Sequence, residues 1–195
     1  MGMENRDEDL MQEYSQGNAE ALNMIFQRYK TPVLNFALRI LGNRADAEDA
    51  VSDVFVAVFE KKYRYDAKAK FTTWLFTVAH NVCISKIRGR KNLVSLWFRN
   101  EETDELEAWE IPDAGELPRE RLNRLQIAGV LRQSIQKLPP EQKEALVLRE
   151  YHGMNYEEIS QVMHCSLEKV KVLIFRAREG LRKELPASLK EERYG

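Results

Sequence analysis

The stretch "NYEEISQVMHCSLEKVKVLIFRARE", residues 155–179, contains two helical patterns only a few residues apart. Asn155 can cap the first helix, and Glu158 stands at the reciprocal position of a capping box. Ser166 can cap the second helix after a short turn. This spacing predicts a helix-turn-helix. The two helices are expected over 156–163 and 167–181.

The second helix of this pair has two faces of different character. At about 100° per residue, its core positions are Leu167, Val170, Ile174, Ala177 and Leu181. The opposite face collects Glu168, Lys169, Val172, Phe175 and Arg176. A valine in the middle of a polar face needs a reason, and two remain open. Val172 either contacts DNA or packs against another domain or protein.

DNA contact fits the chemistry of that outer face, because a helix-turn-helix places its second helix in the major groove. Lys169 and Arg176 can reach guanine edges or phosphates. Val172 can meet a thymine methyl group, and Glu168 can accept a hydrogen bond from a cytosine amino group. Flanking cations set the register by binding phosphates. These are Lys171, Arg178 and Arg182.

Helical periodicity dominates the rest of the chain, and no β pattern is convincing. We predict an all-α fold of two small helical domains, 1–92 and 121–186, with an acidic flexible linker over 93–120 and a tail over 187–195. Pro32 is expected near a helix start, Asp46 as an N-cap and Gly89 as a helix end. A short helix near 102–109 is possible within the linker, whose Trp97, Phe98 and Trp109 are expected to dock on a neighbouring surface. The other predicted helices cover 7–16, 19–29, 33–41, 47–62, 72–88 and 119–137, with another beginning at Pro140.

Charge is segregated along the chain although the net charge is only −1. Between Lys61 and Lys91 there are nine bases and one acid, a balance of +8. Between Glu101 and Glu120 there are nine acids and one base, a balance of −8. Such asymmetry carries information about partners that the net charge conceals, so the net charge of −1 does not argue against a nucleic-acid partner.

Several classes of protein are disfavoured by the sequence. Two cysteines, Cys83 and Cys165, do not make a disulfide framework, which favours a reduced, cytoplasmic chain. His80 and His164 stand near these cysteines, but without zinc spacing and further ligands. The N-terminus has no apolar core typical of a signal peptide, and no run is long enough to insert into a membrane. No nucleophile constellation or phosphate loop is visible, so we expect no catalysis and no cofactor.

The predicted helix over 47–62 has an apolar stripe wider than one core face needs. Its members are Ala50, Val51, Val54, Phe55, Val58 and Phe59. The helix is either buried on two sides within one domain, or packs inside and offers an edge to a partner.

Two longer stretches resemble one family. "DAEDAVSDVFVAVFEKKYRYDAKAKFTTWLFTVAHNVCISKIRGRK" looks like region 2 of extracytoplasmic-function (ECF) sigma factors. "LPPEQKEALVLREYHGMNYEEISQVMHCSLEKVKVLIFRAREGLRKEL" looks like their region 4. The resemblance implies a subunit that binds core RNA polymerase through the beta-prime clamp helices and the beta flap. It also implies that region 2 reads the −10 promoter element and region 4 the −35 element.

The resemblance assigns residues by matching positions. For core polymerase these are Asp49, Ser52, Asp53 and Phe55, where the family more often has Gln-Glu at the Ser52-Asp53 pair. For the −10 DNA they are Lys68, Lys70, Phe71, Trp74, Asn81, Lys86, Arg88 and Arg90. For the −35 DNA they are Ser166, Glu168, Lys169, Lys171, Val172 and Arg176. Lys68 and Lys70 would meet phosphates and Asn81 a base edge, whereas Trp74 either stacks on a base or belongs to the core.

Three further expectations concern partners. The acidic linker would run through a positively charged polymerase channel, stay solvated, or fold back over the basic face. The family implies an anti-sigma factor that hides the DNA and polymerase faces. The competing interpretation is a stand-alone helix-turn-helix regulator, which explains 155–182 but leaves 46–91 unexplained.

Overall fold

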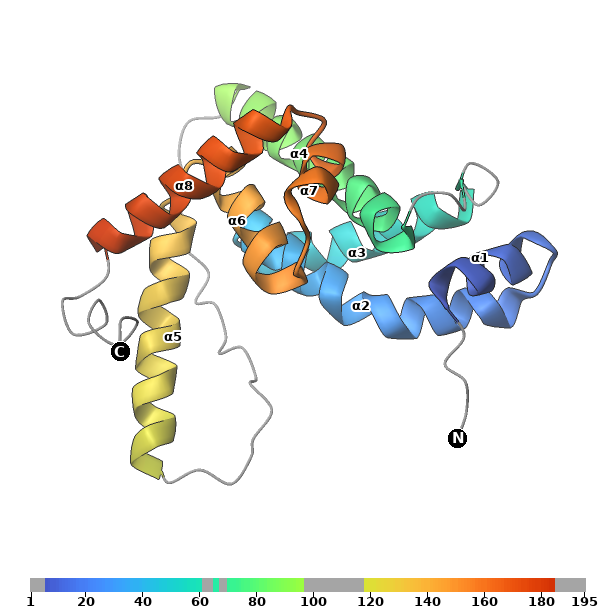
Figure 1. Ribbon diagram of the computed structural model, residues 1–195, viewed down its shortest axis with the longest axis horizontal. Helices are drawn as coiled ribbons and strands as arrows, with labels where there is room; N and C mark the ends of the chain where they lie inside the picture. The colour runs from blue at the N-terminus through green and yellow to red at the C-terminus, as the bar shows by residue number, and fades with distance from the viewer. Residues whose placement is uncertain (1–5, 61–64, 67–69, 97–117, 185–195) are drawn as a thin grey trace.

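The computed structural model describes residues 6–60, 65–66, 70–96 and 118–184. Within those residues the secondary structure is helical and contains no strand, which confirms the all-α prediction (Figure 1). The helices are α1 (Asp7–Ser15), α2 (Ala19–Leu41), α3 (Arg44–Glu60), α4 (Phe71–Leu96), α5 (Pro118–Gln136), α6 (Pro140–His152), α7 (Tyr156–Val162) and α8 (Leu167–Glu184). We call α1–α4 the N-terminal bundle and α5–α8 the C-terminal bundle.

The N-terminal bundle is organised around α2, which packs against α1, α3 and α4. Asn18 caps α2 by accepting a hydrogen bond from the Glu20 N–H, and Gly42 ends it in the left-handed conformation at φ 77°. Val33 and Phe36 lie on the buried face between these ends. The sequence predicts both ends of this helix correctly, because each cap depends only on residues within a few positions of it.

Pro32 does not start a new helix as expected, because α2 runs through it as one element of 23 residues. A proline removes one i→i−4 hydrogen bond and usually kinks or breaks a helix. Here Tyr29 and Val33, on either side of it, are buried among the neighbouring helices. Packing on both sides of the proline therefore outweighs the local cost.

Two other local predictions are wrong. Asn43, not Asp46, caps α3: its side chain accepts a hydrogen bond from the Asp46 N–H at 2.8 Å. Asp46 instead pairs with Arg90 of α4. Gly89 does not end α4, which continues to Leu96. A glycine inside a helix costs about 1 kcal/mol, and it stops a helix only where the chain turns into a left-handed conformation.

The C-terminal bundle follows the sequence prediction closely. Pro140 opens α6 at its first turn, and Gly153 ends it at φ 64°. The capping box of α7 is complete, with Asn155 and Glu158 each accepting from the other's backbone N–H. α5 projects away from the body of the molecule (Figure 1).

The two bundles pack against each other, which the sequence did not predict. α7 lies against α4, and α6 lies against α2. One hydrophobic core runs through both bundles, from Leu10 and Phe36 to Leu148 and Ile174. Apart from the interface, the domain boundaries stay predictions. The possible helix near 102–109 and the linker aromatics Trp97, Phe98 and Trp109 lie outside the described residues.

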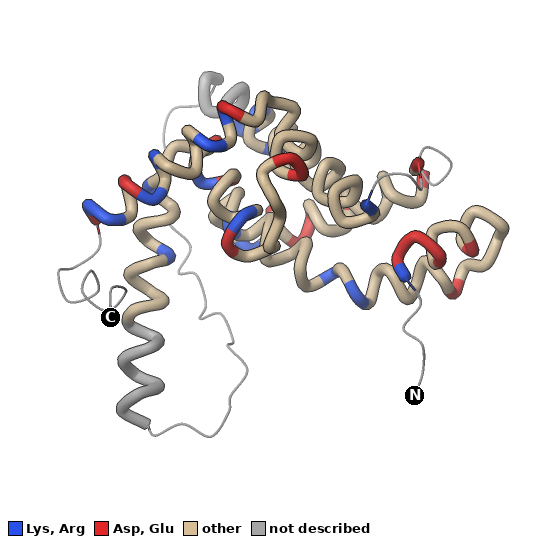
Figure 2. The backbone as a smooth tube through the Cα atoms, in the orientation of Figure 1, with Lys and Arg blue, Asp and Glu red and all other residues tan. Residues whose placement is uncertain are grey.

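Lys and Arg recur along α8, whereas acidic positions gather on α1 (Figure 2). Over the described part of the chain, no helix is both long and apolar enough to cross a membrane.

Candidate nucleic-acid interface

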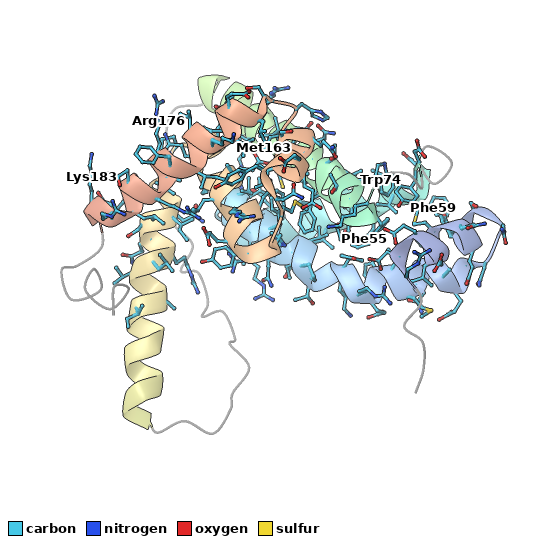
Figure 3. All side chains as sticks on the ribbon, viewed as in Figure 1. Phe55, Phe59, Trp74, Met163, Arg176 and Lys183 are labelled. Carbon is cyan, nitrogen blue, oxygen red and sulfur yellow. The ribbon has the colours of Figure 1, made fainter. Side chains whose placement is uncertain are left out.

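The outer face of α8 is open to solvent, as predicted. Val172 is 46% exposed and Phe175 is 66% exposed. Glu168, Lys169 and Arg176 are exposed beside them, and the labelled Arg176 points away from the body of the molecule (Figure 3). An exposed phenylalanine and valine among charges favour a surface that meets a ligand with apolar features. Phe175, which the sequence analysis placed on this face but not in the site, belongs with it.

The inner face holds α8 in place. Ser166 accepts a hydrogen bond from the Lys169 N–H at 3.2 Å and so caps the helix. Val170, Ile174 and Ala177 are buried, as is Leu173. The helix is therefore anchored along one side against α6 and α7, and its outer side chains project from a rigid support.

Two cations of α8 are paired with α6. Lys169 donates to Glu141 at 2.8 Å, and this hydrogen bond raises the pKa of Lys169. Arg178 donates to Glu150 at 2.7 Å. All four side chains are well exposed, so each pair contributes little to stability and can exchange its acid for a phosphate.

Three of the predicted −10 side chains, on α4 or just before it, pair with acids of other helices. Lys70 donates to Glu158 of α7 at 2.7 Å, and that hydrogen bond raises the pKa of Lys70. Lys86 pairs with Asp53 of α3 at 2.8 Å. Arg90 pairs with Asp46, as described above, whereas Asn81 and Arg88 are exposed. Lys68 lies outside the described residues.

An aromatic cluster marks the start of α4. Phe71 is fully buried, with its ring 5.3 Å from that of Tyr29 and 5.8 Å from that of Trp74. In this conformation Phe71 supports Trp74 and presents no face of its own for stacking. Trp74 is half-buried and lies 5.3 Å from Tyr65. The sequence analysis did not single out Tyr65, because it lies in a polar, basic connection.

The outer edge of α3 is a separate surface. Asp49, Ser52 and Asp53 are exposed, as the prediction requires. Phe55 is only half-exposed because its ring packs edge-on against Phe26 at 4.8 Å. The exposed apolar residues are instead Val56 and Phe59, at 57% and 56%. Figure 3 shows Phe55 and Phe59 on the side of the molecule where α1 and α3 meet.

A groove of about 400 Å³ connects the α3 edge to α4. Its lining includes Asp53 from α3 and Asn81, Ser85 and Lys86 from α4. The predicted polymerase-binding and −10 residues are therefore neighbours on one surface.

The histidines and cysteines form no metal centre in the part of the chain that the structure describes, where no three His, Cys, Asp or Glu side chains converge. Cys83 is fully buried, and burial raises the pKa of its thiol to about 12. This thiol is inert at neutral pH.

Two family models match the chain, one within the N-terminal bundle and one within the C-terminal bundle. Sigma-70 region 2 matches residues 25–92, which contain α3 and most of α4. Sigma-70 region 4 matches residues 128–181, which contain α6, α7 and most of α8.

Full-length relatives give the same result. The ECF RNA polymerase sigma factor SigW of Bacillus subtilis is 30% identical over 176 residues, which cover 90% of this chain and 94% of SigW. The RNA polymerase sigma-H factor of Pseudomonas aeruginosa is 29% identical over 188 residues, or 95% of this chain and 97% of that protein.

Solved structures agree on the fold. CnrH, in a complex with the cytosolic domain of CnrY, superposes with a TM-score of 0.64 at 24% identity and covers 92% of this chain and 96% of its own. The sigma factor RpoE of Bartonella quintana, in a complex with the anti-sigma factor NepR, gives a TM-score of 0.65 at 22% identity, covering 88% and 98%.

Proposed function

The chain belongs to the ECF RNA polymerase sigma factors, and we propose that its two bundles divide promoter recognition between α4 and α8. A sigma factor binds core RNA polymerase and directs transcription initiation at promoters. The observation that carries the assignment is the solvent-facing surface of α8, with Val172, Phe175 and Arg176 presented from a buried inner face. A stand-alone helix-turn-helix regulator would not need the region 2 match over 25–92.

Core polymerase binds the outer edge of α3 in this proposal. Asp49, Ser52 and Asp53 offer acid and hydroxyl groups to the beta-prime clamp helices. Phe55 holds this edge in place by packing against Phe26 of α2. Val56 and Phe59 add the apolar area that a docking surface needs. The beta flap is the corresponding partner of the C-terminal bundle.

The −10 element meets α4 and the connection before it. Lys68, Lys70, Lys86, Arg88 and Arg90 supply charge for phosphates, and Asn81 supplies an amide for a base edge. Trp74, with Tyr65 beside it, offers the aromatic surface on which unpaired bases stack. Phe71 acts through these rings by holding them in place.

The −35 element meets the outer face of α8. Ser166, Glu168, Lys169, Val172 and Arg176 point toward the groove, and Lys171 toward the backbone. The exposed ion pairs of Lys169 and Arg178 release their acids when phosphates arrive.

The remaining assignments follow from the family role. We propose that the chain has no catalytic activity and no cofactor of its own, and that it acts in the cytoplasm, where the chromosome lies. We also propose an anti-sigma factor as a partner. The exposed Val56 and Phe59 support this, as does the fold shared with RpoE, which was solved with the anti-sigma factor NepR, and with CnrH, which was solved with the cytosolic domain of CnrY.

The test is reconstitution with bacterial core polymerase on a library of promoter fragments, with and without core. We expect sequence-selective open complexes only when both components are present. Asp49→Lys should abolish core binding, whereas Glu13→Lys, a matched change on α1, should not. Selective DNA binding without core, together with no core association, would leave a conventional regulator.

A further inference from the structure

The first turn of α1 is acidic and contains Asp7, Glu8 and Asp9 (Figure 2). Two of these acids reach other helices of the N-terminal bundle. Oε1 of Glu8 accepts a hydrogen bond from the Phe71 N–H of α4 at 3.2 Å, although the two residues are 63 positions apart in the sequence. The region 2 match begins at residue 25, after the end of α1, so it assigns no role to this contact.

Glu8 caps α4 from another helix. The first four N–H groups of a helix have no partner within that helix, and the N–H of Phe71 is one of them. The usual capping acceptor is the side chain of the residue just before the helix. Here that residue is Lys70, whose ammonium group donates but cannot accept. The carboxylate of Glu8 supplies the acceptor instead, and its negative charge suits the positive end of α4.

The capped residue is the base of the aromatic cluster at the start of α4. The ring of Phe71 is fully buried, and its centre lies 5.3 Å from that of Tyr29. The rings of Tyr65 and Trp74 are each 5.8 Å from it. A shift in the first turn of α4 would move the Phe71 ring and the rings that rest on it. The position of the whole cluster therefore depends on the cap.

Asp7 holds the same cluster through Tyr29. Its carboxylate accepts hydrogen bonds from the Tyr29 hydroxyl group and from the Arg28 guanidinium. Burial, together with the charges of Glu8 and Asp7, raises the pKa of Tyr65 to about 12. Both acids are therefore close enough to the cluster to influence it.

We propose that Glu8 is a positioning residue for −10 strand binding. Glu8 contacts no DNA itself. Its cap on α4 fixes the Phe71 ring, and this ring orients the pair formed by Trp74 and Tyr65, on which unpaired bases stack. This inference rests on the proposed function, in which that pair meets the −10 element.

The position of Trp74 can be measured without DNA. Trp97→Phe and Trp109→Phe leave Trp74 as the only tryptophan, and acrylamide quenching of its fluorescence then reports how exposed the ring is. Glu8→Ala removes the acceptor for the Phe71 N–H, so quenching should increase. Glu8→Gln keeps an accepting oxygen on a side chain of the same length, so quenching should match that of the chain with Glu8. Unchanged quenching in Glu8→Ala overturns the proposal.

Strand binding tests the functional consequence. The probe is the non-template strand of a promoter fragment enriched in the selection described above, and the protein is the full chain bound to core polymerase. Glu8→Ala should weaken binding of this strand about fivefold, which is the size of effect that loss of a helix cap produces. Glu8→Gln, which keeps the cap, should restore the affinity of the unaltered chain. A loss of the same size in both variants overturns the proposal.

Asp9 provides the matched control. It lies one residue away in the same turn, and its carboxylate pairs with Arg6 at 3.1 Å. Asp9→Ala removes the same charge and should change neither the quenching nor the strand binding. Thermal unfolding and binding to core polymerase confirm that each variant is folded. A parallel loss of −10 strand and −35 duplex binding in Glu8→Ala would show a general structural role and overturns the proposal.

The two proposals fail separately. If quenching responds to Glu8→Ala but even the unaltered complex does not bind the strand, the assignment of the aromatic cluster to the −10 element is wrong. If the unaltered complex binds the strand and Glu8→Ala binds it equally well, the positioning role is wrong and the sigma function stands.

Discussion

α4 and α8 are the two helices that we propose to bind promoter DNA, and their surroundings differ. The outer face of α8 is solvent-exposed, and its ion pairs are with its own bundle. α4 contacts the other bundle through His80, as does Lys70 just before it, and Phe71 at the start of the helix is buried. The proposed −35 surface is therefore exposed to solvent, whereas the proposed −10 surface is partly in contact with the other bundle.

The largest expected effect separates two phenylalanines, one on each helix. Phe71 of α4 is fully buried, whereas Phe175 of α8 is 66% exposed. Phe71→Ala should lower the free energy of unfolding by about 3–5 kcal/mol, because it leaves a cavity under Trp74 and Tyr29. Phe175→Ala should change it by less than about 0.5 kcal/mol. Urea unfolding monitored by circular dichroism measures both, and similar losses would contradict the comparison.

Arg176 tests whether the exposed face of α8 binds −35 DNA in the free chain. Arg176→Ala should weaken binding of the free chain to a −35 duplex by about 2 kcal/mol, or roughly thirtyfold, if the guanidinium reads a base. Fluorescence anisotropy measures the affinity, and Lys183→Ala, at the far end of the same helix, is the control. A uniform loss across all sequences, with a salt slope reduced by about 1, would mean that Arg176 contacts only phosphate.

The docked state, in which α6 and α7 pack against α2 and α4, should depend on pH through His152, whose ring lies 4.3 Å from that of Phe76 of α4. Burial, together with the nearby Arg39, lowers the pKa of His152 from 6.5 to about 4 in the docked state. The separated state then binds the proton more tightly, so docking is fully favourable above about pH 6.5 and weakens as the pH falls toward 4. Between pH 7 and 5 the loss should be somewhat under 2 kcal/mol.

The control for this pH dependence is His152→Phe, which has no proton to bind at that position. The His80–Glu144 pair is present in both chains and therefore does not distinguish them. The measurement is the distance between spin labels at Thr31→Cys on α2 and Glu157→Cys on α7, both exposed positions, in each chain as a function of pH. Parallel curves would show that His152 does not set the pH dependence.

The sequence predicts the surroundings of α8 better than those of α4. The helix-turn-helix was predictable because Asn155, Glu158 and Ser166 make hydrogen bonds within a few residues of themselves, and because the apolar side chains on the outer face of α8, Val172 and Phe175, are exposed. The contacts of α4 with the C-terminal bundle were not predictable. Glu144, His80 and His152 look like ordinary polar positions on separate helices, and periodicity reports that a face is buried without reporting what covers it.

The errors within the N-terminal bundle have the same origin. Pro32 and Gly89 are local signals for a helix boundary. Packing outweighs the cost of Pro32 within α2, and α4 continues through Gly89 because the chain does not turn there. Asn43 and Asp46 are both good capping residues, and only the fold decides between them, since Asp46 is needed by Arg90. Phe71 matched a family position for DNA binding, but no sequence pattern shows that its ring lies beneath two others.

The smallest expected effect concerns the turn between α7 and α8. His164 stands between α7, which packs on α4, and α8, which does not, and its φ of 51° is in the left-handed region. Such a conformation costs a residue with a Cβ about 1–2 kcal/mol, partly offset by the extra freedom that glycine has in the unfolded chain. His164→Gly should therefore raise the free energy of unfolding by about 0.5–1 kcal/mol. His164→Ala loses the same ring contact with His80 but keeps the Cβ, so the difference between the two variants isolates the backbone strain. If alanine is as stable as glycine in thermal unfolding, the turn is not strained, and the rigidity of α8 comes from its buried face alone.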